Sequence, residues 1–237
     1  MVLGFAAAGA DVVIASRKVE NCETLAQDVR ERFGREGMPY ACHVGNWDQL
    51  EKLTDAAYDR FDNIDILVNN AGMSPIYDKL TDISEALWDK VLDVNLKGSF
   101  RLSTLVGSRM TAGQGGSIIN ISSMAAVEET ADVIPYSAAK AGLNAMTMGF
   151  ANAYGPKVRV NCIQAGPFKT DISKAWDAEL FARQEQGFAA GRAGEPEEVV
   201  GAALYFASAA SSYCTGAVLA LDGGRPRGAS CYEPHQW

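Results

Sequence analysis

Histidine and closely spaced cysteine are scarce in this chain of 237 residues, and their scarcity excludes several kinds of site. The histidines are His43 and His235, too few for a histidine-rich metal site, and a Ser-His-Asp hydrolase would depend on one of them. The cysteines are odd in number, widely spaced and without a Cys-x-x-Cys motif. This pattern argues against a disulfide framework and a zinc ribbon, and it favours a reducing, cytoplasmic setting. We therefore expect no metal site.

Long apolar runs and an excess of positive charge are also missing. No segment approaches the roughly 20 apolar residues that cross a bilayer, so we expect no membrane span. The formal net charge is -8 and the sequence pI is about 4.8, which gives a nucleic acid or an anionic membrane no general attraction. No Pro/Gly/Ser-rich linker and no internal repeat divides the chain. A single domain without nucleic-acid or membrane partners is therefore predicted.

Short β-branched or apolar runs alternate with segments of helical period. The expected buried strands are Asp11 to Ala15, Ile64 to Val68, Ser117 to Ile121, Val158 to Ile163 and Ala217 to Leu221. Cys22 to Phe33 and Trp47 to Phe61 are each long enough to form a crossover helix, and Asn46 is placed to cap the second. The alternation predicts an α/β fold with a Rossmann-like, doubly wound parallel sheet.

Tyr136 and Lys140 form the first candidate catalytic pair. Their spacing of four residues places a phenol and an ammonium on one face of a helix. A tyrosine has an ordinary pKa of about 10, and a nearby cation favours the phenolate, so the pair is suited to proton transfer. Standing alone, the same spacing would favour the simpler interpretation, a pair of side chains four residues apart on the surface of a helix.

Polar residues follow two of the expected strands and support a functional role for Tyr136 and Lys140. One strand delivers Ser122 and Ser123 to its C-terminal end, and another is followed by Asn69-Asn70-Ala71-Gly72. Open α/β sheets bind ligands at that edge, and glycine lets a ligand come close to the backbone. A simple turn is the competing interpretation of the Asn-Asn pair. A hydrolase using either serine is a distant alternative, because the Gly-x-Ser-x-Gly elbow is missing.

Taken together and in order, these motifs resemble the short-chain dehydrogenase/reductase family. The resemblance rests on Asn69-Asn70-Ala71-Gly72, Val94-Asn95-Leu96-Lys97-Gly98, Ser123, Tyr136-x-x-x-Lys140 and Leu221-Asp222-Gly223-Gly224, and it runs from residue 1 to about Gly224. It implies hydride transfer between a nicotinamide cofactor and a small-molecule carbonyl or secondary alcohol, with Tyr136 as general acid/base. It also implies that Lys140 binds the nicotinamide ribose, Ser123 bonds the substrate oxygen and Asn95 holds a water. The 3-oxoacyl-ACP reductase and gluconate 5-dehydrogenase subgroups both fit.

The expected cofactor is NADP(H), with NAD(H) as the second choice. An acidic residue after the strand Asp11 to Ala15 would bind the ribose 2′-hydroxyl of NAD, but Ser16 and Arg17 stand there. A guanidinium fits a phosphate, whereas a solvated arginine is the competing interpretation. By the resemblance, the remaining cofactor contacts are Val44, Asn70, Ala71, Gly72, Tyr136, Lys140, Phe168 and Thr170. Residues Asp171 to Ala193, with Trp176, Phe181 and Phe188, correspond to a substrate lid.

The chain departs from the family at its front. Members begin with a strand and a Thr-Gly-x-x-x-Gly-x-Gly turn that holds the cofactor pyrophosphate, and this sequence contains neither. Met1 to Ala8 resembles the back half of the helix that would follow. We expect an incomplete domain over residues 1–224 and a tail over 225–237. The missing strand would lie in mid-sheet, so we hypothesise that Met1 is an internal methionine of a longer protein or that another segment fills the gap.

Two consequences of the resemblance stay open from the sequence alone. The absence of the phosphate-binding turn raises the alternative of a catalytically silent structural or binding protein. Family members also commonly assemble symmetrically, so a homo-oligomer, either a dimer or a tetramer, is expected.

Overall fold

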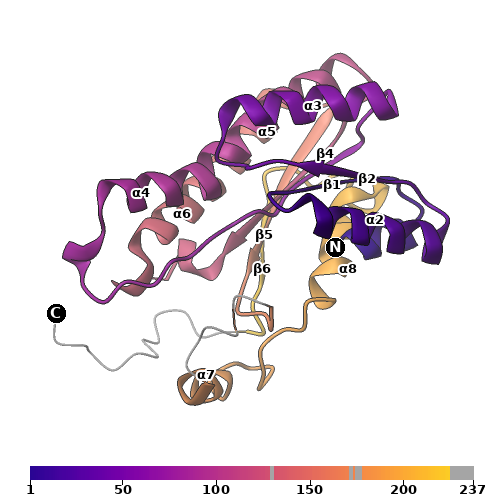
Figure 1. The fold of residues 1–237 in the computed structure, drawn as a ribbon. Coiled ribbons are helices and arrows are strands. Elements are labelled where there is room, and N and C mark those ends of the chain that lie inside the picture. The colour runs from indigo at the N-terminus through magenta and orange to yellow at the C-terminus, as the bar shows by residue number, and fades with distance from the viewer. Residues whose placement is uncertain (129–130, 171–172, 174–177, 225–237) are drawn as a thin grey trace.

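The strands of this protein are all paired in parallel, and helices cover both sides of them. The computed structural model describes residues 1–128, 131–170, 173 and 178–224, so the expected tail 225–237 lies outside the described part. Figure 1 shows the arrangement of the elements. Within the described ranges, none of the helices is both long enough and apolar enough to cross a membrane.

The strands follow the apolar runs of the sequence, with one addition. They are β1 (Val12–Ser16), β2 (Gly37–Ala41), β3 (Ile66–Asn69), β4 (Gly116–Ser123), β5 (Val158–Ala165) and β6 (Val218–Leu221). The helices are α1 (Val2–Ala7), α2 (Val19–Phe33), α3 (Trp47–Phe61), α4 (Glu85–Leu92), α5 (Gly98–Ala112), α6 (Ile134–Tyr154), α7 (Ala178–Glu185) and α8 (Glu198–Ala207). The predicted elements are therefore confirmed to within a few residues at their ends.

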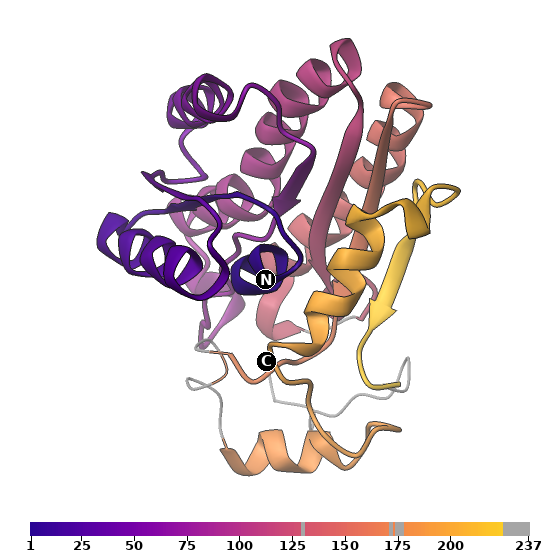
Figure 2. The ribbon, with the colours of Figure 1, turned by 90° about the vertical axis from the view of Figure 1, so that its right-hand side faces the viewer.

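The predicted doubly wound arrangement is confirmed, because helices pack on both faces of the parallel strands. Helices α3, α4, α5 and α6 pack together, and α5 and α6 contact β4 and β5. Helices α1, α2 and α8 form the other layer, in which α1 contacts both α2 and α8, and α8 contacts β4 and β5. Figure 2 shows α2 and β6 at opposite sides of the molecule, with α7 below the main body.

The central strands β4 and β5 carry the core. Ile118, Val158 and Val160 are buried with α5 and α6 on one face, while Ile119 and Ile163 are buried with α8 on the other. Burial on both faces explains why apolar residues such as Ile118 and Ile119 follow one another in β4 without alternation. The capping prediction at Asn46 is also confirmed, because its side chain accepts a hydrogen bond from the backbone N–H of Gln49 at 3.1 Å.

Strand β2 was missed by the sequence prediction because it begins with Gly37 and contains Pro39. Its pairing with β1 explains how it tolerates proline. The backbone N–H of Val12 bonds the carbonyl of Glu36, and that of Cys42 bonds the carbonyl of Ser16. Alternation along a parallel strand then turns Pro39 toward the outer edge, where no partner for an N–H is needed.

The predicted α/β arrangement of parallel strands is confirmed, and within the described residues the strands form two sheets. One sheet is β1-β2, and the other has the order β3-β4-β5-β6. Within the described ranges, no strand lies between β1 and β3, so each of these strands is paired along one edge only. Whether this break corresponds to the family's first strand and glycine-rich turn stays a prediction at this point.

Candidate active site

Tyr136 and Lys140 lie one turn apart at the start of α6, as the spacing predicted. The Lys140 ammonium nitrogen is 5.6 Å from the centroid of the Tyr136 ring. Lys140 is 3% exposed, and its Nζ donates a hydrogen bond to the carbonyl of Ile121 at 2.8 Å. The end of β4 therefore fixes the lysine directly beside the tyrosine.

Burial dominates the proton affinities of this pair. It raises the pKa of Tyr136, while a hydrogen bond with the Ser123 side chain lowers it by less. Burial also lowers the pKa of Lys140 to about 8. The sequence had suggested that the neighbouring cation brings the tyrosine pKa down, and that expectation is wrong here because desolvation of the phenolate is the larger effect. The phenol is therefore protonated at neutral pH, ready to donate.

The two serines that follow one another at the end of β4 have different surroundings. The Ser122 hydroxyl is buried and donates to the carbonyl of Lys140 at 3.2 Å. The Ser123 hydroxyl is hydrogen-bonded with Tyr136 and accepts from the backbone N–H of Ala125 at 3.2 Å. The geometry gives Ser122 a role in holding α6 against β4, and it places Ser123 at the tyrosine.

Asn95 is fully buried in a π-helical turn, Asp93–Lys97, between α4 and α5. Its amide nitrogen donates to the carbonyls of Met73 at 2.8 Å and Val91 at 2.9 Å, and its oxygen accepts from the Met73 N–H at 3.1 Å. Single π-turns of this kind are frequent at functional sites. In this structure Asn95 holds the segment after β3 in place, and the expected water-binding role stays a prediction.

Gly72 lies where this segment meets the catalytic pair. A Cβ atom at Gly72 would lie 3.0 Å from the side-chain oxygen of Asn95 and 3.6 Å from the Lys140 ammonium nitrogen. The absence of a side chain therefore keeps the space in front of the lysine open. It also explains why a glycine stands at this position of the Asn-Asn-Ala-Gly motif.

A cavity of about 1690 Å³ joins most of the predicted site residues. Its lining includes Ser16, Arg17, Val44, Asn70, Ala71, Gly72, Ser123, Tyr136, Lys140, Phe168 and Thr170. Asn95 is the exception, since it lies behind the lining. Segments far apart in the sequence thus meet at the C-terminal ends of the parallel strands, where open α/β sheets bind ligands.

The front of the cavity is formed by the segments after β1 and β2. Arg17 is exposed and has no ion-pair partner among the described residues. Gly98 packs directly against the carbonyl of Val44, which fixes the backbone there. His43, beside Val44, uses its Nδ1 to accept from the Gly45 N–H at 3.1 Å.

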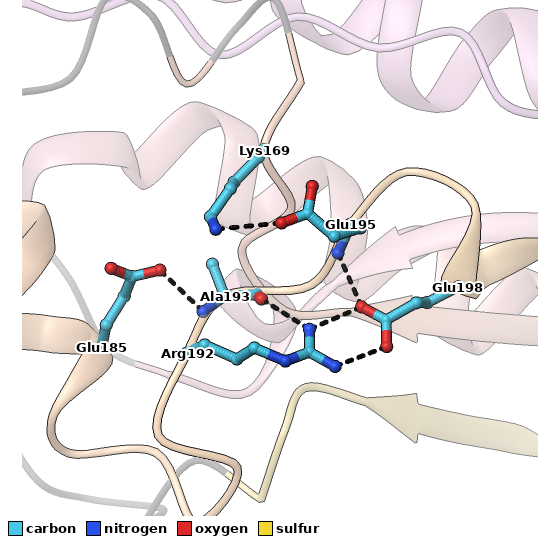
Figure 3. A network of polar contacts seen from close by, with 6 residues as sticks. All are labelled: Lys169, Glu185, Arg192, Ala193, Glu195 and Glu198. Atoms are coloured by element: carbon cyan, nitrogen blue, oxygen red, sulfur yellow. Dashed lines mark hydrogen bonds and ion pairs between the residues drawn. The ribbon is translucent and has the colours of Figure 1, made fainter.

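The segment that carries Phe168 and Thr170 is held by a network of ion pairs (Figure 3). Lys169 bonds Glu195 at 2.9 Å, and Arg192 bonds Glu198 through both of its terminal nitrogens at 2.7 Å. These hydrogen bonds, foremost those from Arg192, lower the pKa of Glu198 to about 2, so the carboxylate is ionised at ordinary pH. The network ties the cavity wall to the start of α8.

The structure describes only part of the predicted substrate lid, Asp171 to Ala193. Trp176 lies outside the described residues. Phe181, on α7, lines the cavity, whereas Phe188 is buried. Glu185, at the end of α7, accepts from the Ala193 N–H at 2.8 Å and so joins this segment to the ion-pair network (Figure 3). No group of three residues suited to a metal ion is found in the part of the chain that the structure describes.

Sequence reasoning missed a buried polar network behind the site. Asn69 donates to Ser103 at 3.0 Å and to Asn120 at 2.8 Å, and Asn120 donates to Thr147 at 2.9 Å. These side chains connect β3, α5, β4 and α6. The signal that could have revealed it is Asn120, a polar residue in the middle of an apolar strand. Buried networks of this kind rigidify the elements that they join.

Tyr77 was also missed, and it holds the beginning of the catalytic helix. Its hydroxyl donates to the carbonyl of Ala131 at 2.6 Å and accepts from the Ile134 N–H at 2.9 Å. Ile134 is the first residue of α6, two positions before Tyr136. A tyrosine in an irregular segment gives no sequence signal for such a role.

We expect Tyr77→Phe to lower the free energy of unfolding by about 1 to 2 kcal/mol, because two backbone groups lose their hydrogen-bond partner. Denaturant unfolding followed by circular dichroism measures this change. Tyr205→Phe, at an exposed position on α8, is the matched control and should be neutral. Equal stability of Tyr77→Phe and the control would contradict the capping role.

Known proteins match this chain over most of its residues and over most of their own. The family model described as Enoyl-(Acyl carrier protein) reductase matches residues 1–225. Dehydrogenase/reductase SDR family member 4 of Oryctolagus cuniculus is 35% identical over 223 residues, which cover 92% of this chain and 85% of that protein.

Two solved structures extend the comparison to cofactor complexes. A gluconate 5-dehydrogenase from Burkholderia cenocepacia in complex with NADP and tartrate is 33% identical, with a TM-score of 0.88 and coverage of 94% of this chain and 89% of that chain. A 7α-hydroxysteroid dehydrogenase in complex with NADH and 7-oxo glycochenodeoxycholic acid is 29% identical, with a TM-score of 0.91 and coverage of 97% and 89%. The chain belongs to the short-chain dehydrogenase/reductase family of oxidoreductases.

Proposed function

We propose that this protein is an oxidoreductase that transfers a hydride between NADP(H) and a small-molecule carbonyl or secondary alcohol. The observation that carries the proposal is the Ser123-Tyr136-Lys140 cluster, which lies on one wall of the large cavity at the C-terminal ends of the strands. Such a cluster can bind an oxygen atom and exchange a proton with it.

The residues on the cavity fit a nicotinamide cofactor. Gly72 leaves open space beside the Lys140 ammonium, and Lys140 has donors left to bind a ribose hydroxyl after its bond to Ile121. When bound, the cofactor supplies or accepts the hydride. Asn70, Ala71, Phe168 and Thr170 line the same cavity and would contact the remainder of the cofactor.

The protein's own contribution is to orient the substrate oxygen and to move a proton. In the reducing direction, the Ser123 hydroxyl bonds the substrate oxygen and the Tyr136 hydroxyl gives up its proton to it. The Lys140 ammonium stabilises the phenolate that remains, because opposite charges attract strongly in a buried site. In the oxidising direction, the phenolate takes the proton back.

Arg17 is the basis for preferring NADP(H). We expect Arg17→Glu to weaken NADPH binding about 10- to 100-fold relative to NADH, since a charge-assisted bond is lost and a like charge is added. Tryptophan fluorescence titrations with both cofactors measure the ratio. Lys18→Glu makes the same change of charge at the neighbouring residue, which does not line the cavity, and should leave the ratio unchanged. An unchanged ratio in Arg17→Glu would contradict the assignment.

A catalytically silent binding protein is the second candidate, and the break between β1 and β3 is the observation that favours it. As part of our proposal, the break corresponds to the first strand and the glycine-rich turn of the family. Saturable NADPH binding by this chain argues for the enzyme, and its absence argues for the silent protein. A homo-oligomeric assembly and a cytoplasmic location are further parts of the proposal, supported by the family membership and by the free cysteines 22, 42, 162 and 214.

The direct test is turnover with substrates taken from the relatives. We expect the chain to reduce 7-oxo glycochenodeoxycholic acid with NADPH, or to oxidise gluconate with NADP, and mass spectrometry identifies the product. If the cofactor binds saturably but neither compound gives product, these two substrates are rejected. The proton-transfer site is then tested with other ketones.

A further inference from the structure

Buried polar side chains lie between β5 and the catalytic helix α6. Cys162 and Gln164 are two residues apart on β5, so they share one face of the sheet, and they are 0% and 2% exposed. Both contact Asn144, which lies on α6 one turn after Lys140. Val160, one step earlier on the same face, belongs to the apolar core. The sheet face therefore changes from apolar to polar where it meets the part of α6 that carries Lys140.

The hydrogen bonds among these side chains all run in one direction. The Cys162 thiol donates to Asn144 Oδ1 at 3.4 Å, and Asn144 Nδ2 donates to Gln164 Oε1 at 2.9 Å. Gln164 Nε2 donates in turn to the sulfur of Met124 at 3.2 Å. Hydrogen bonds aligned in this way polarise and strengthen one another. Gln164 thus joins the catalytic helix to the turn that follows β4.

Met124 connects these hydrogen bonds to the catalytic serine. It is 1% exposed, lines the cavity and is the first residue of the short 3₁₀ turn after β4. Ser123 caps this turn by accepting from the Ala125 N–H at 3.2 Å, and its hydroxyl is also hydrogen-bonded with Tyr136. A methionine side chain is flexible, because it has three rotatable bonds. The bond from Gln164 to its sulfur therefore holds both the side chain and the turn in one position.

The other end of the hydrogen-bonded series lies near Lys140. Burial raises the pKa of the Cys162 thiol to about 11, an effect larger than the lowering by the nearby Lys140 ammonium. The thiol is therefore protonated at neutral pH and can serve as the donor to Asn144. The series thus runs from the surroundings of Lys140 to those of Ser123.

We propose that Gln164 is a positioning residue, which holds the turn after β4 against α6 and so sets the position of the Ser123 hydroxyl relative to Tyr136. Gln164 itself does not line the cavity, so it acts through Met124 and Ser123. Hydrogen bonds weaken steeply when their geometry is lost, and a small misplacement of a reacting group slows a reaction strongly. The effect on turnover rests on the proposed function, whereas the effect on the turn does not.

The first test replaces Gln164 by methionine, which has a similar shape but neither the amide donor nor the acceptor. We expect Gln164→Met to lower kcat about 10-fold with a ketone and NADPH, and to leave the dissociation constant of NADPH unchanged. We also expect the backbone amide of Ala125 to exchange its hydrogen about 10-fold faster, because the turn is no longer held. Stopped assays, fluorescence titration and hydrogen exchange measure these three quantities, and circular dichroism verifies the fold.

A double variant separates positioning from a general effect on the structure. If Gln164 acts through the serine hydroxyl, Gln164→Met has little left to change once that hydroxyl is removed. In the background of Ser123→Ala we therefore expect Gln164→Met to change kcat by less than about 2-fold. The same loss of kcat with and without the Ser123 hydroxyl would overturn the proposal.

Two further variants complete the experiment. Ser117→Ala removes a buried hydrogen bond on the α8 side of β4, to the carbonyl of Phe206, and should change neither kcat nor exchange at Ala125. Asn144→Leu removes the partner of the Gln164 oxygen at a half-buried position, so it should act like Gln164→Met and replaces that variant if it does not fold.

Exchange of the Ala125 amide also decides the proposal without turnover. If the wild type reduces no ketone, the proposed function fails, while faster exchange in Gln164→Met or Asn144→Leu still supports the positioning of the turn. Exchange at Ala125 that is equal in these variants and in Ser117→Ala would overturn the proposal, whatever the activity of the wild type.

Discussion

Replacement of Tyr136 by phenylalanine is expected to lower kcat/KM by about 10³- to 10⁴-fold while leaving the fold unchanged. In the proposed mechanism the phenol hydroxyl exchanges a proton with the substrate oxygen, and phenylalanine keeps the ring that packs beside Lys140. The buried hydroxyl has a hydrogen bond with Ser123, which the variant loses. Steady-state rates with a ketone and NADPH measure the effect, and circular dichroism verifies the fold.

A matched control separates this effect from a general effect of removing a tyrosine hydroxyl. Tyr213 is fully exposed, and Tyr213→Phe should have the activity of the wild type. A rate for Tyr136→Phe within a few-fold of that control would show that another group transfers the proton. The assignment of the site to Tyr136 would then be wrong.

Replacement of Lys140 by methionine is expected to have opposite effects on activity and on stability. We expect kcat/KM to fall at least about 10²-fold, because the ammonium that is proposed to stabilise the phenolate and to bind the cofactor ribose is lost. Lys157→Met is the matched control, since Lys157 is exposed and does not line the cavity, and it should retain activity. Equal activity of the two variants would contradict the role of Lys140.

The stability of Lys140→Met follows from the pKa of the lysine. Burial lowers that pKa to about 8 from 10.5, a difference that corresponds to about 3 kcal/mol. Below pH 8 the folded wild type carries this full cost of a buried charge, and the cost fades as the pH rises from about 8 to 10.5, because the unfolded chain then binds more protons than the folded one. Methionine removes the cost but leaves the Ile121 carbonyl unpaired, which offsets part of the gain.

At pH 7 we therefore expect Lys140→Met to have a free energy of unfolding about 1 to 2 kcal/mol higher than the wild type, and at pH 10.5 to have lost that advantage. Urea unfolding at several pH values measures both quantities. A variant that is less stable than the wild type at pH 7 would mean that Lys140 stabilises the folded protein, which would contradict this prediction.

The sequence was sufficient to predict the parts of the site that rest on order and spacing. Tyr136, Lys140 and Ser123 come together because one strand and the following helix end and begin where the residue pattern indicated. The segments predicted to contact the cofactor line one cavity because the ends of parallel strands share an edge. These relations depend on local structure and on topology, both of which the apolar pattern encodes.

The parts that escaped prediction depend on tertiary contacts or on solvation. Strand β2 contains Pro39, which only its edge position makes acceptable. The hydroxyl of Tyr77 holds the start of α6 from a segment more than fifty residues earlier in the chain. The pKa of Tyr136 rises instead of falling because burial, which spacing does not reveal, outweighs the lowering effect of the hydrogen bond with Ser123. Side-chain chemistry alone could not indicate any of these.

The most direct test of the central claim follows a deuterium atom from cofactor to product. NADPH deuterated on the transferred position of its nicotinamide ring is mixed with 7-oxo glycochenodeoxycholic acid or another ketone, and the alcohol is analysed by mass spectrometry. We predict deuterium on the carbinol carbon with the wild-type chain and a rate at least about 10³-fold lower with Tyr136→Phe. Product formed equally fast by both proteins, or bound cofactor that never transfers deuterium to any ketone, would contradict the account.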